Sequence, residues 1–281
     1  MEPLDNLLEG APRFRTARVA VHHRADWDVY LPELERFASN PAIAEMFGRL
    51  RDRPPRGVHE HVWRVWIERP FLRRVEEFTS PSDTDPFTTA GMSETIEWWW
   101  TPAEGRVHVK DRDISGGIGM LTTDGGRDLT AQELRETDAR LPLFRIDVHP
   151  MVGELLDPRK SLLQPGAEFE IVGPDELLGR RATRIRMTLA DWNTRTPITS
   201  ENLWVADDYD LVVDDATRII LRLACRAEGE EFSVREMTDV AFDEPIDPSI
   251  WEPPPDVPRR GPGPLPNIAG ALKRRSRGRR R

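Results

Sequence analysis

The sequence predicts a mainly β (α+β) fold, in which an antiparallel sheet packs with a few helices. After residue 167, strand-like segments follow one another at short intervals, with turn-forming residues between them at Gly179, Asp214-Asp215 and Gly229. Closely spaced strands without crossover helices are typical of an antiparallel meander. We therefore expect strands at 169–172, 185–189, 208–213, 219–226 and 232–242.

One of these strands also indicates how the sheet is solvated. Four small or apolar residues, Ile219, Leu221, Leu223 and Cys225, alternate with two arginines, Arg222 and Arg226. Side chains alternate between the two faces of a strand. The pattern predicts a sheet with one apolar face and one face in water.

The first half of the chain predicts strands at 13–24, 58–68, 71–79, 93–100 and 106–110. Residues 102–105 form a plausible hairpin turn between the last two. In the first strand, Val19, Val21 and His23 share a face, and in the second strand Trp63, Val65 and Ile67 share one. We expect these faces to contribute to the core.

Helices are expected at fewer places. Residues 31–50 predict one or two short helices, the second beginning at Pro41 with Asn40 as its cap. Residues 148–163 predict helical pieces broken by Pro158, and the glycine-rich, acidic segment 113–140 predicts a loop with a short helix.

Composition predicts one large domain, residues 1–252, followed by a disordered tail, residues 253–281, rich first in proline and then in arginine. The sequence has no apolar run of membrane-spanning length, no N-terminal secretory pattern and one cysteine, Cys225. These features favour a cytoplasmic protein.

The end of the tail, residues 273–281, carries seven basic residues although the net charge of the chain is −9. It could hold the protein on the inner face of an anionic membrane, attract nucleic acid non-specifically, or simply be solvated. The acidic body makes nucleic acid an unlikely partner. The basic residues are Lys273, Arg274, Arg275, Arg277, Arg279, Arg280 and Arg281.

Three consecutive tryptophans raise the question of what covers them. Alternation places Ile96, Trp98 and Trp100 on one face and Glu97 and Trp99 on the other. Burying one indole stabilises the fold by at most about 4–6 kcal/mol, so the first face should be covered. A helix of the same chain, a ligand in an apolar cavity and a protein partner are the three alternatives.

Several segments resemble the outer-membrane lipoprotein carrier (LolA-like) superfamily. They are "RVWIERPFLRRVEE", the "WWWTPAEG" hairpin, "ELLGRRATRIRMTL", and the run from "ADDYDLVVDDATRIILRLACRAEGEEF" to "FDEPIDPSIWEPPP". The superfamily includes lipoprotein carriers, envelope glycolipid carriers and the N-terminal domain of a periplasmic sigma-factor regulator (RseB-like). Carriers of this kind work outside the cytoplasm. The resemblance implies a half-barrel sheet wrapped around helices, with acyl chains held on its concave face.

The resemblance also implies a function and a set of residues. The expected function is that of a non-enzymatic binding protein for an apolar or lipid-like ligand. The alternative is a regulatory module with a closed core that binds a protein. The expected inward-facing positions are Trp63, Ile96, Trp98, Trp100, Ile185, Met187, Leu221 and Leu223.

Polar chemistry is sparse. Glu236 lies on an otherwise apolar face of its strand, so either a bulge turns it outward or its carboxylate meets a ligand head group or an arginine. His59 and His61 share a face, but zinc would need two more ligands, so we expect no metal and no cofactor. We also expect no catalytic residues, with Cys225 an inert packed thiol.

Overall fold

The computed structural model describes residues 13–36, 54–68, 72–92, 96–101, 106–111, 123–124, 127–128, 150–157, 167–189, 206–253 and 259–260. One twelve-stranded sheet dominates them, in the order β14-β6-β5-β4-β3-β2-β1-β13-β12-β11-β10-β9. Its strands are β1 (Thr16–Asp26), β2 (Val58–Glu68), β3 (Leu72–Phe78), β4 (Thr88–Met92), β5 (Ile96–Thr101), β6 (Arg106–Asp111), β9 (Ala167–Leu177), β10 (Arg180–Leu189), β11 (Asp208–Asp214), β12 (Ile220–Ala227), β13 (Glu230–Phe242) and β14 (Arg259–Arg260).

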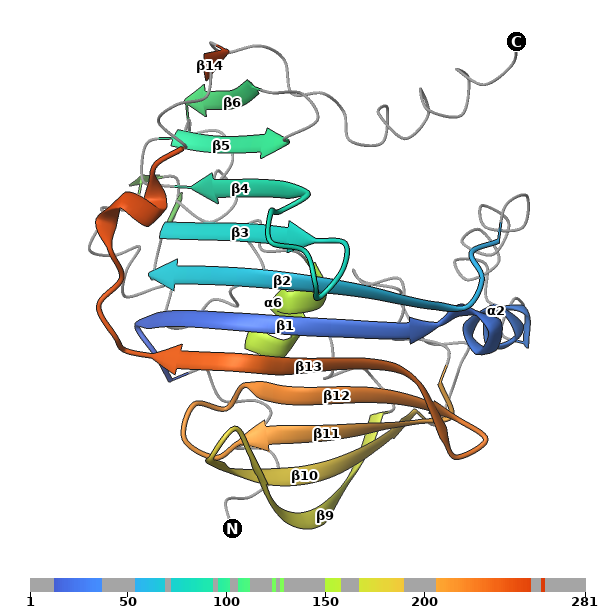
Figure 1. Ribbon diagram of the computed structural model, residues 1–281. Helices are drawn as coiled ribbons and strands as arrows, with labels where there is room; N and C mark the ends of the chain where they lie inside the picture. The colour runs from blue at the N-terminus through green and yellow to red at the C-terminus, as the bar shows by residue number, and fades with distance from the viewer. Residues whose placement is uncertain are drawn as a thin grey trace, which may run out of the picture.

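The sheet consists of two antiparallel meanders that meet at its centre (Figure 1). One runs from β1 to β6 and the other from β9 to β13, and β1 pairs with β13 between them. The pairing of β14 with β6 is parallel, and the other pairings are antiparallel. The predicted mainly β, antiparallel open sheet with a few helices is confirmed, and β4 is a strand that the sequence did not indicate.

In the residues that the structure describes, two α-helices accompany the sheet. Helix α2 (Trp27–Arg36) continues from β1 at one end of the sheet, where Arg36 forms an ion pair with Asp207, next to β11. Helix α6 (Pro150–Leu156) lies on one face, behind β1 and β2 in Figure 1, and contacts β12. Strands β7 (Thr123–Asp124) and β8 (Arg127–Asp128) form a separate hairpin. Among the described residues, no helix is both long and apolar enough to cross a membrane.

The face that α6 covers is the inner face of the sheet. Its core unites buried side chains of the central strands with those of α6, and Val19, Val21, Trp63, Val65 and Ile67 all belong to it. The face-sharing predicted for β1 and β2 is confirmed. From β10 to β12 the same core contains Ile185, Met187, Tyr209, Leu211, Leu221 and Leu223.

The three tryptophans lie on β5 with the opposite orientation to the one that we expected. Residues directly opposite each other in a ladder point to the same face. The inner row passes across five strands through Val19, Val65, Val75, Ala90 and Trp99. Trp99 is therefore the indole on the inner face.

Trp98 and Trp100 lie on the outer face. The expectation that they line the concave side is therefore wrong. The row of Trp98 passes through Gly91, Arg74 and Trp66. Trp98 is 0% exposed, whereas Trp100 is half-buried. Ile96 has the strand parity of Trp98, opposite Asp111, but its side chain lies outside the described residues.

A C-terminal segment, residues 243–252, covers Trp98 from outside; we call it the strap. It leaves β13 and runs along one edge of the sheet past the ends of β1 and β2, and its helix η4 (Pro248–Trp251) contacts β3 (Figure 1). The indole nitrogen of Trp98 donates a hydrogen bond to the carbonyl oxygen of Trp251 at 3.0 Å, and Arg74 donates to that of Ile250 at 3.2 Å. The cover over Trp98 thus comes from the same chain, as in the first of our three alternatives, but on the unexpected face.

The region after residue 252 differs in one respect from the predicted disordered tail. Arg259 and Arg260 form β14, which adds to the edge of β6 beside Val107 and His108. The seven basic residues of 273–281 lie outside the described residues, as do most of the predicted helical segment 31–50 and most of 113–140.

Replacing Gly91 with alanine should destabilise the protein. A Cβ atom at Gly91 would lie 2.3 Å from the Trp98 ring, which the strap holds in place. We expect Gly91→Ala to lower the free energy of unfolding by about 1–3 kcal/mol in urea titrations. In a Trp98→Leu background the same change should cost much less, because the ring is gone. Equal costs in both backgrounds would contradict this packing.

Candidate functional site on the inner face of the sheet

The two halves of the inner face differ in accessibility. In the half from β10 to β13, the nominated positions Ile185, Met187, Leu221 and Leu223 are completely buried among the chain's own side chains. In the half from β2 to β5, several inner side chains are only partly covered. The partly accessible half is where a ligand can reach the sheet without displacing the core.

We call this accessible region the inner strip. Its residues are His61, Trp63, Val75, Glu77, Ala90 and Trp99. Trp63 is nearly fully buried and forms the floor, while the other five are half-buried. Val75, Ala90 and Trp99 follow one row across three strands, and Glu77 lies beside Trp63 in the ladder. The strip therefore offers an apolar track with two polar groups at one end.

The polar end of the strip is built around Trp63. The imidazoles of His23 and His61 stack on its ring, with centroids at 6.1 and 5.8 Å. His61 Nδ1 lies 3.9 Å from Glu77 Oε1, and the indole of Trp63 hydrogen-bonds to Glu77. These contacts place an imidazole and a carboxylate on the edge of an apolar surface.

Burial keeps both polar groups of the strip toward their neutral forms. It lowers the pKa of His61, and the charge of His59 lowers it further. It raises the pKa of Glu77, against a smaller opposing effect of the Trp63 hydrogen bond. Neutral imidazole and carboxyl groups donate and accept hydrogen bonds, which suits a ligand with an uncharged polar group.

Glu236 does not face the concave side. The register between β1 and β13 shifts between Ala20 and Val21, so that Thr238 is an extra residue. This bulge turns Glu236 outward, the first of our two alternatives, where its carboxylate accepts a hydrogen bond from Arg222 Nε at 3.1 Å.

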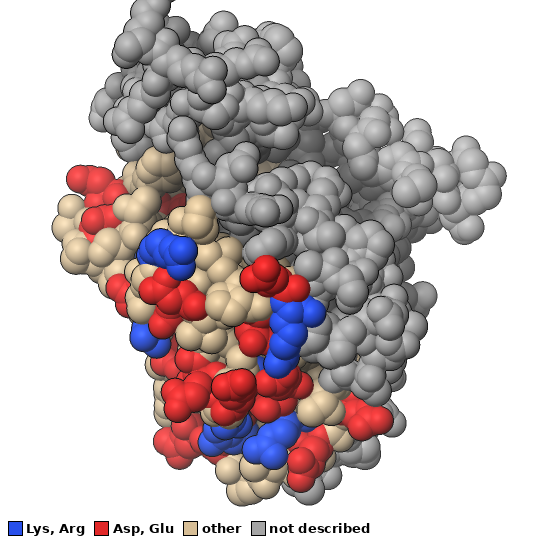
Figure 2. Space-filling view, turned by 90° about the vertical axis from the view of Figure 1, so that its right-hand side faces the viewer, with Lys and Arg blue, Asp and Glu red and all other residues tan. Residues whose placement is uncertain are grey.

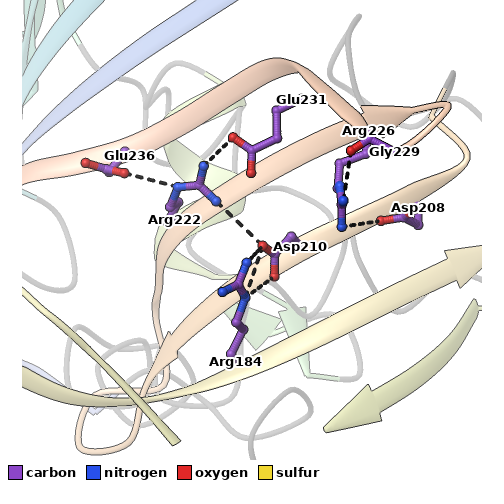
Figure 3. Close-up of polar contacts among 8 residues, drawn as sticks. All are labelled: Arg184, Asp208, Asp210, Arg222, Arg226, Gly229, Glu231 and Glu236. Carbon is purple, nitrogen blue, oxygen red and sulfur yellow. Dashed lines mark hydrogen bonds and ion pairs between the residues drawn. The ribbon is translucent and has the colours of Figure 1, made fainter. Parts of the chain in front are cut away.

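On the outer face, Glu236 belongs to a network of alternating charges (Figure 3). Arg222 also contacts Glu231 at 2.6 Å and Asp210 at 3.7 Å, and Asp210 pairs with Arg184. These groups satisfy one another across β10 to β13. The network therefore stabilises the wet face of the sheet rather than presenting an unpaired charge to a partner.

A second polar cluster lies deeper on the inner face, and we call it the buried island. It comprises His23, Glu154, Cys225, Ser233 and Arg235, each at most 3% exposed. His23 Nε2 and Ser233 Oγ lie 3.2 Å apart, and Arg235 pairs with Glu154 of α6. Burial raises the pKa of Cys225 to about 12, so its thiol stays protonated, as a packed cysteine should.

The sequence did not single out Arg235, Glu154, Glu77 or Trp99. Glu154 carries a weak signal, because it is the one charged residue in the apolar helix PMVGELL. Arg235 alternates with Ser233 and Met237, so its inward orientation follows only when the bulges at either end of β13 are known. Among the described residues, no group of three or more His, Cys, Asp or Glu side chains could hold a metal ion.

The surface of the molecule is charged, in contrast to this interior. Figure 2 shows one side of the molecule, where acidic side chains predominate among the described residues and arginines lie between them. Such a surface repels the phosphates of nucleic acids.

No family model matches the chain, and no curated protein does so. Several solved structures are similar at low identity. MucB has a TM-score of 0.41 and 9% identity over 91% of this chain and 62% of its own. The lipoprotein LppX from Mycobacterium tuberculosis has a TM-score of 0.35 and 9% identity, over 84% of this chain and 90% of its own. A LolA superfamily protein from Nitrosomonas europaea has a TM-score of 0.28 and 10% identity, over 90% of this chain and 99% of its own.

The superfamily that the sequence suggested is thus found among the similar structures. The same set of similar structures contradicts the expected cytoplasmic location with contact to the inner membrane face, so that expectation is wrong. The similar structures include a lipoprotein from Mycobacterium tuberculosis and an outer membrane lipoprotein-sorting protein domain from Vibrio parahaemolyticus.

Stability should fall as the solution is acidified, partly because of His61. Its folded-state pKa lies below the ordinary value of 6.5, so the unfolded chain takes up the proton first. The contribution is complete above pH 6.5 and is lost as the pH falls toward the folded-state pKa. Urea titrations between pH 7.5 and 5 should show a smaller decline for His61→Gln than for wild type. His59→Gln, at an exposed position, removes only the smaller of the two effects on His61, so its decline should lie between those of His61→Gln and wild type.

Proposed function

We propose that the protein is a non-enzymatic binding protein that holds an apolar or lipid-like ligand on the inner strip. The observation that supports this most is the contrast between the two halves of the inner face. The β10–β13 half is packed, whereas Val75, Ala90 and Trp99 form an apolar track that is only half-covered. An accessible apolar surface of this kind favours a ligand, because covering it removes apolar area from water.

The geometry also suggests an orientation for the ligand. An aliphatic chain can lie along the track from Trp99 to Val75, while a polar group meets His61 and Glu77 at the end of the strip. Trp63 is the part of the strip next to the buried island, where it stacks with His23, and it forms an apolar floor beneath the ligand. Few polar groups around an apolar surface are typical of small-molecule sites.

A second function is a regulatory module that binds a protein and takes up no ligand. It is favoured by the burial, to 1% exposure or less, of five of the eight positions nominated from the sequence: Trp98, Ile185, Met187, Leu221 and Leu223. A closed core would leave the outer surface as the binding element. Co-purification of a stoichiometric protein partner, with no small molecule retained, would favour this alternative.

Substitutions on opposite faces of the sheet test the proposal. Val75→Gln places an amide in the inner strip, and Val62→Gln makes the same change at a half-buried position on the outer face. We expect Val75→Gln to weaken binding of a fluorescent acyl probe at least tenfold, with Val62→Gln within about twofold of wild type. Native mass spectrometry of the gently purified protein should show a retained ligand. A protein that carries no ligand and binds no acyl probe would refute the proposal.

A further inference from the structure

The buried island contains a cation whose hydrogen-bonding capacity is only partly used. Arg235 lies on the inner face of β13, between Leu223 of β12 and His23 of β1, and is 1% exposed. Burying a guanidinium is costly unless its charge and its donors are satisfied. Its contacts therefore indicate what the site is built to hold.

One side of the guanidinium is occupied and the other is not. Arg235 Nη1 donates to Glu154 Oε2 at 2.6 Å and to the carbonyl oxygen of Met151 at 3.3 Å. Within the described part of the chain, no acceptor reaches Nη2, although it is buried. A carboxylate can satisfy two guanidinium nitrogens side by side, and Glu154 satisfies only one. The pair is thus weaker than the geometry of the two groups permits.

Glu154 reaches Arg235 from α6, the helix that covers the sheet at this point. Glu154 Oε2 lies 2.6 Å from Arg235 Nη1, so an anion that binds the guanidinium competes with the Glu154 carboxylate for it. The anion has to move the Glu154 side chain alone, because Val152, Leu155 and Leu156 hold α6 in the core.

The island lies close enough to the inner strip for one ligand to reach both. Arg235 is opposite His23, and His23 is opposite His61, so Arg235 is two strand spacings from the strip, about 10 Å. Between them lies the flat face of Trp63, on which His23 and His61 stack. A chain extending from Arg235 over Trp63 would continue onto Val75 and Trp99.

We propose that Arg235 anchors the carboxylate of a long-chain monocarboxylate, and that Glu154 occupies the guanidinium when no ligand is bound. The proposal rests on the proposed function, because the aliphatic chain lies on the inner strip. The carboxylate anchor at Arg235 makes the ligand an acid rather than a neutral lipid. It also reverses the orientation proposed above, in which the polar head group meets His61 and Glu77.

Two probes that differ only in charge test this inference. Hexadecanoic acid and its methyl ester should be titrated separately into the full chain, with displacement of a fluorescent acyl probe as the measurement. We expect the acid to bind at least tenfold more tightly than the ester, because a hydrogen-bonded charge is lost with the ester. Equal binding of the two would overturn the inference and leave the proposed function standing. Binding of neither would refute both.

A paired substitution then assigns the preference to Arg235. Replacing a buried ion pair by apolar residues of similar size commonly preserves folding, so Arg235→Met combined with Glu154→Leu is the variant of choice. It should bind the ester as wild type does and show no preference for the acid. A preference that persists in this variant would overturn the inference.

Glu154→Gln provides an independent test if the double variant does not fold. It removes the competing carboxylate and keeps a side chain of the same shape beside Arg235. The affinity for the acid should rise about tenfold or more and that for the ester should change little, because only the acid competes with Glu154. An unchanged or lower ratio of the two affinities would contradict the inference.

Discussion

The antiparallel pairing of β1 with β13 is the constraint on which the rest of the structure depends. It joins the two meanders into one sheet, since β1 belongs to the N-terminal meander and β13 to the C-terminal one. Its register runs from Ala17 beside Phe242 to Ala25 beside Ser233. Without it, the aromatic half with Trp63 and the aliphatic half with Leu223 would each expose an apolar face.

The same pairing decides which side chains of β13 enter the interior. A shift of one residue in a ladder moves every following side chain to the other face. The bulge at Thr238 keeps Val240 and Phe242 on the inner side beside Val19 and Ala17, and it places Met237 and Arg235 there as well. Arg235 becomes a buried cation and Glu236 a surface anion because of this one extra residue.

These two residues also show how far the sequence can predict the fold. Alternation within a strand is local, and it correctly grouped Val19 with Val21 and Trp63 with Val65. Which face of β5 turns inward depends on partners far away in sequence, and alternation does not contain that information. Trp98 lies outside because the strap, more than 140 residues later, supplies its cover and a carbonyl for its indole nitrogen.

The candidate site was less predictable than the fold for a related reason. The sequence offered large apolar residues as a ligand surface, but large apolar residues also make the best core, and Ile185 and Met187 are used in that way. The residues of the inner strip stand out only by their partial exposure, which is a property of the assembled sheet. Trp99 was assigned to the opposite face from the one it occupies.

Polar groups on an otherwise apolar face explain why part of the sheet remains available for binding. His61 and Glu77 weaken the packing of their half, because burial disfavours the charged form of each. The β10–β13 half packs Ile185, Met187, Leu211 and Leu223 at inner positions and closes completely, and its buried cation Arg235 is paired with Glu154 of α6. Natural chains depart from the rule of an apolar core mainly where function requires it. The half of the sheet that gives up stability is therefore the half where a ligand would restore it.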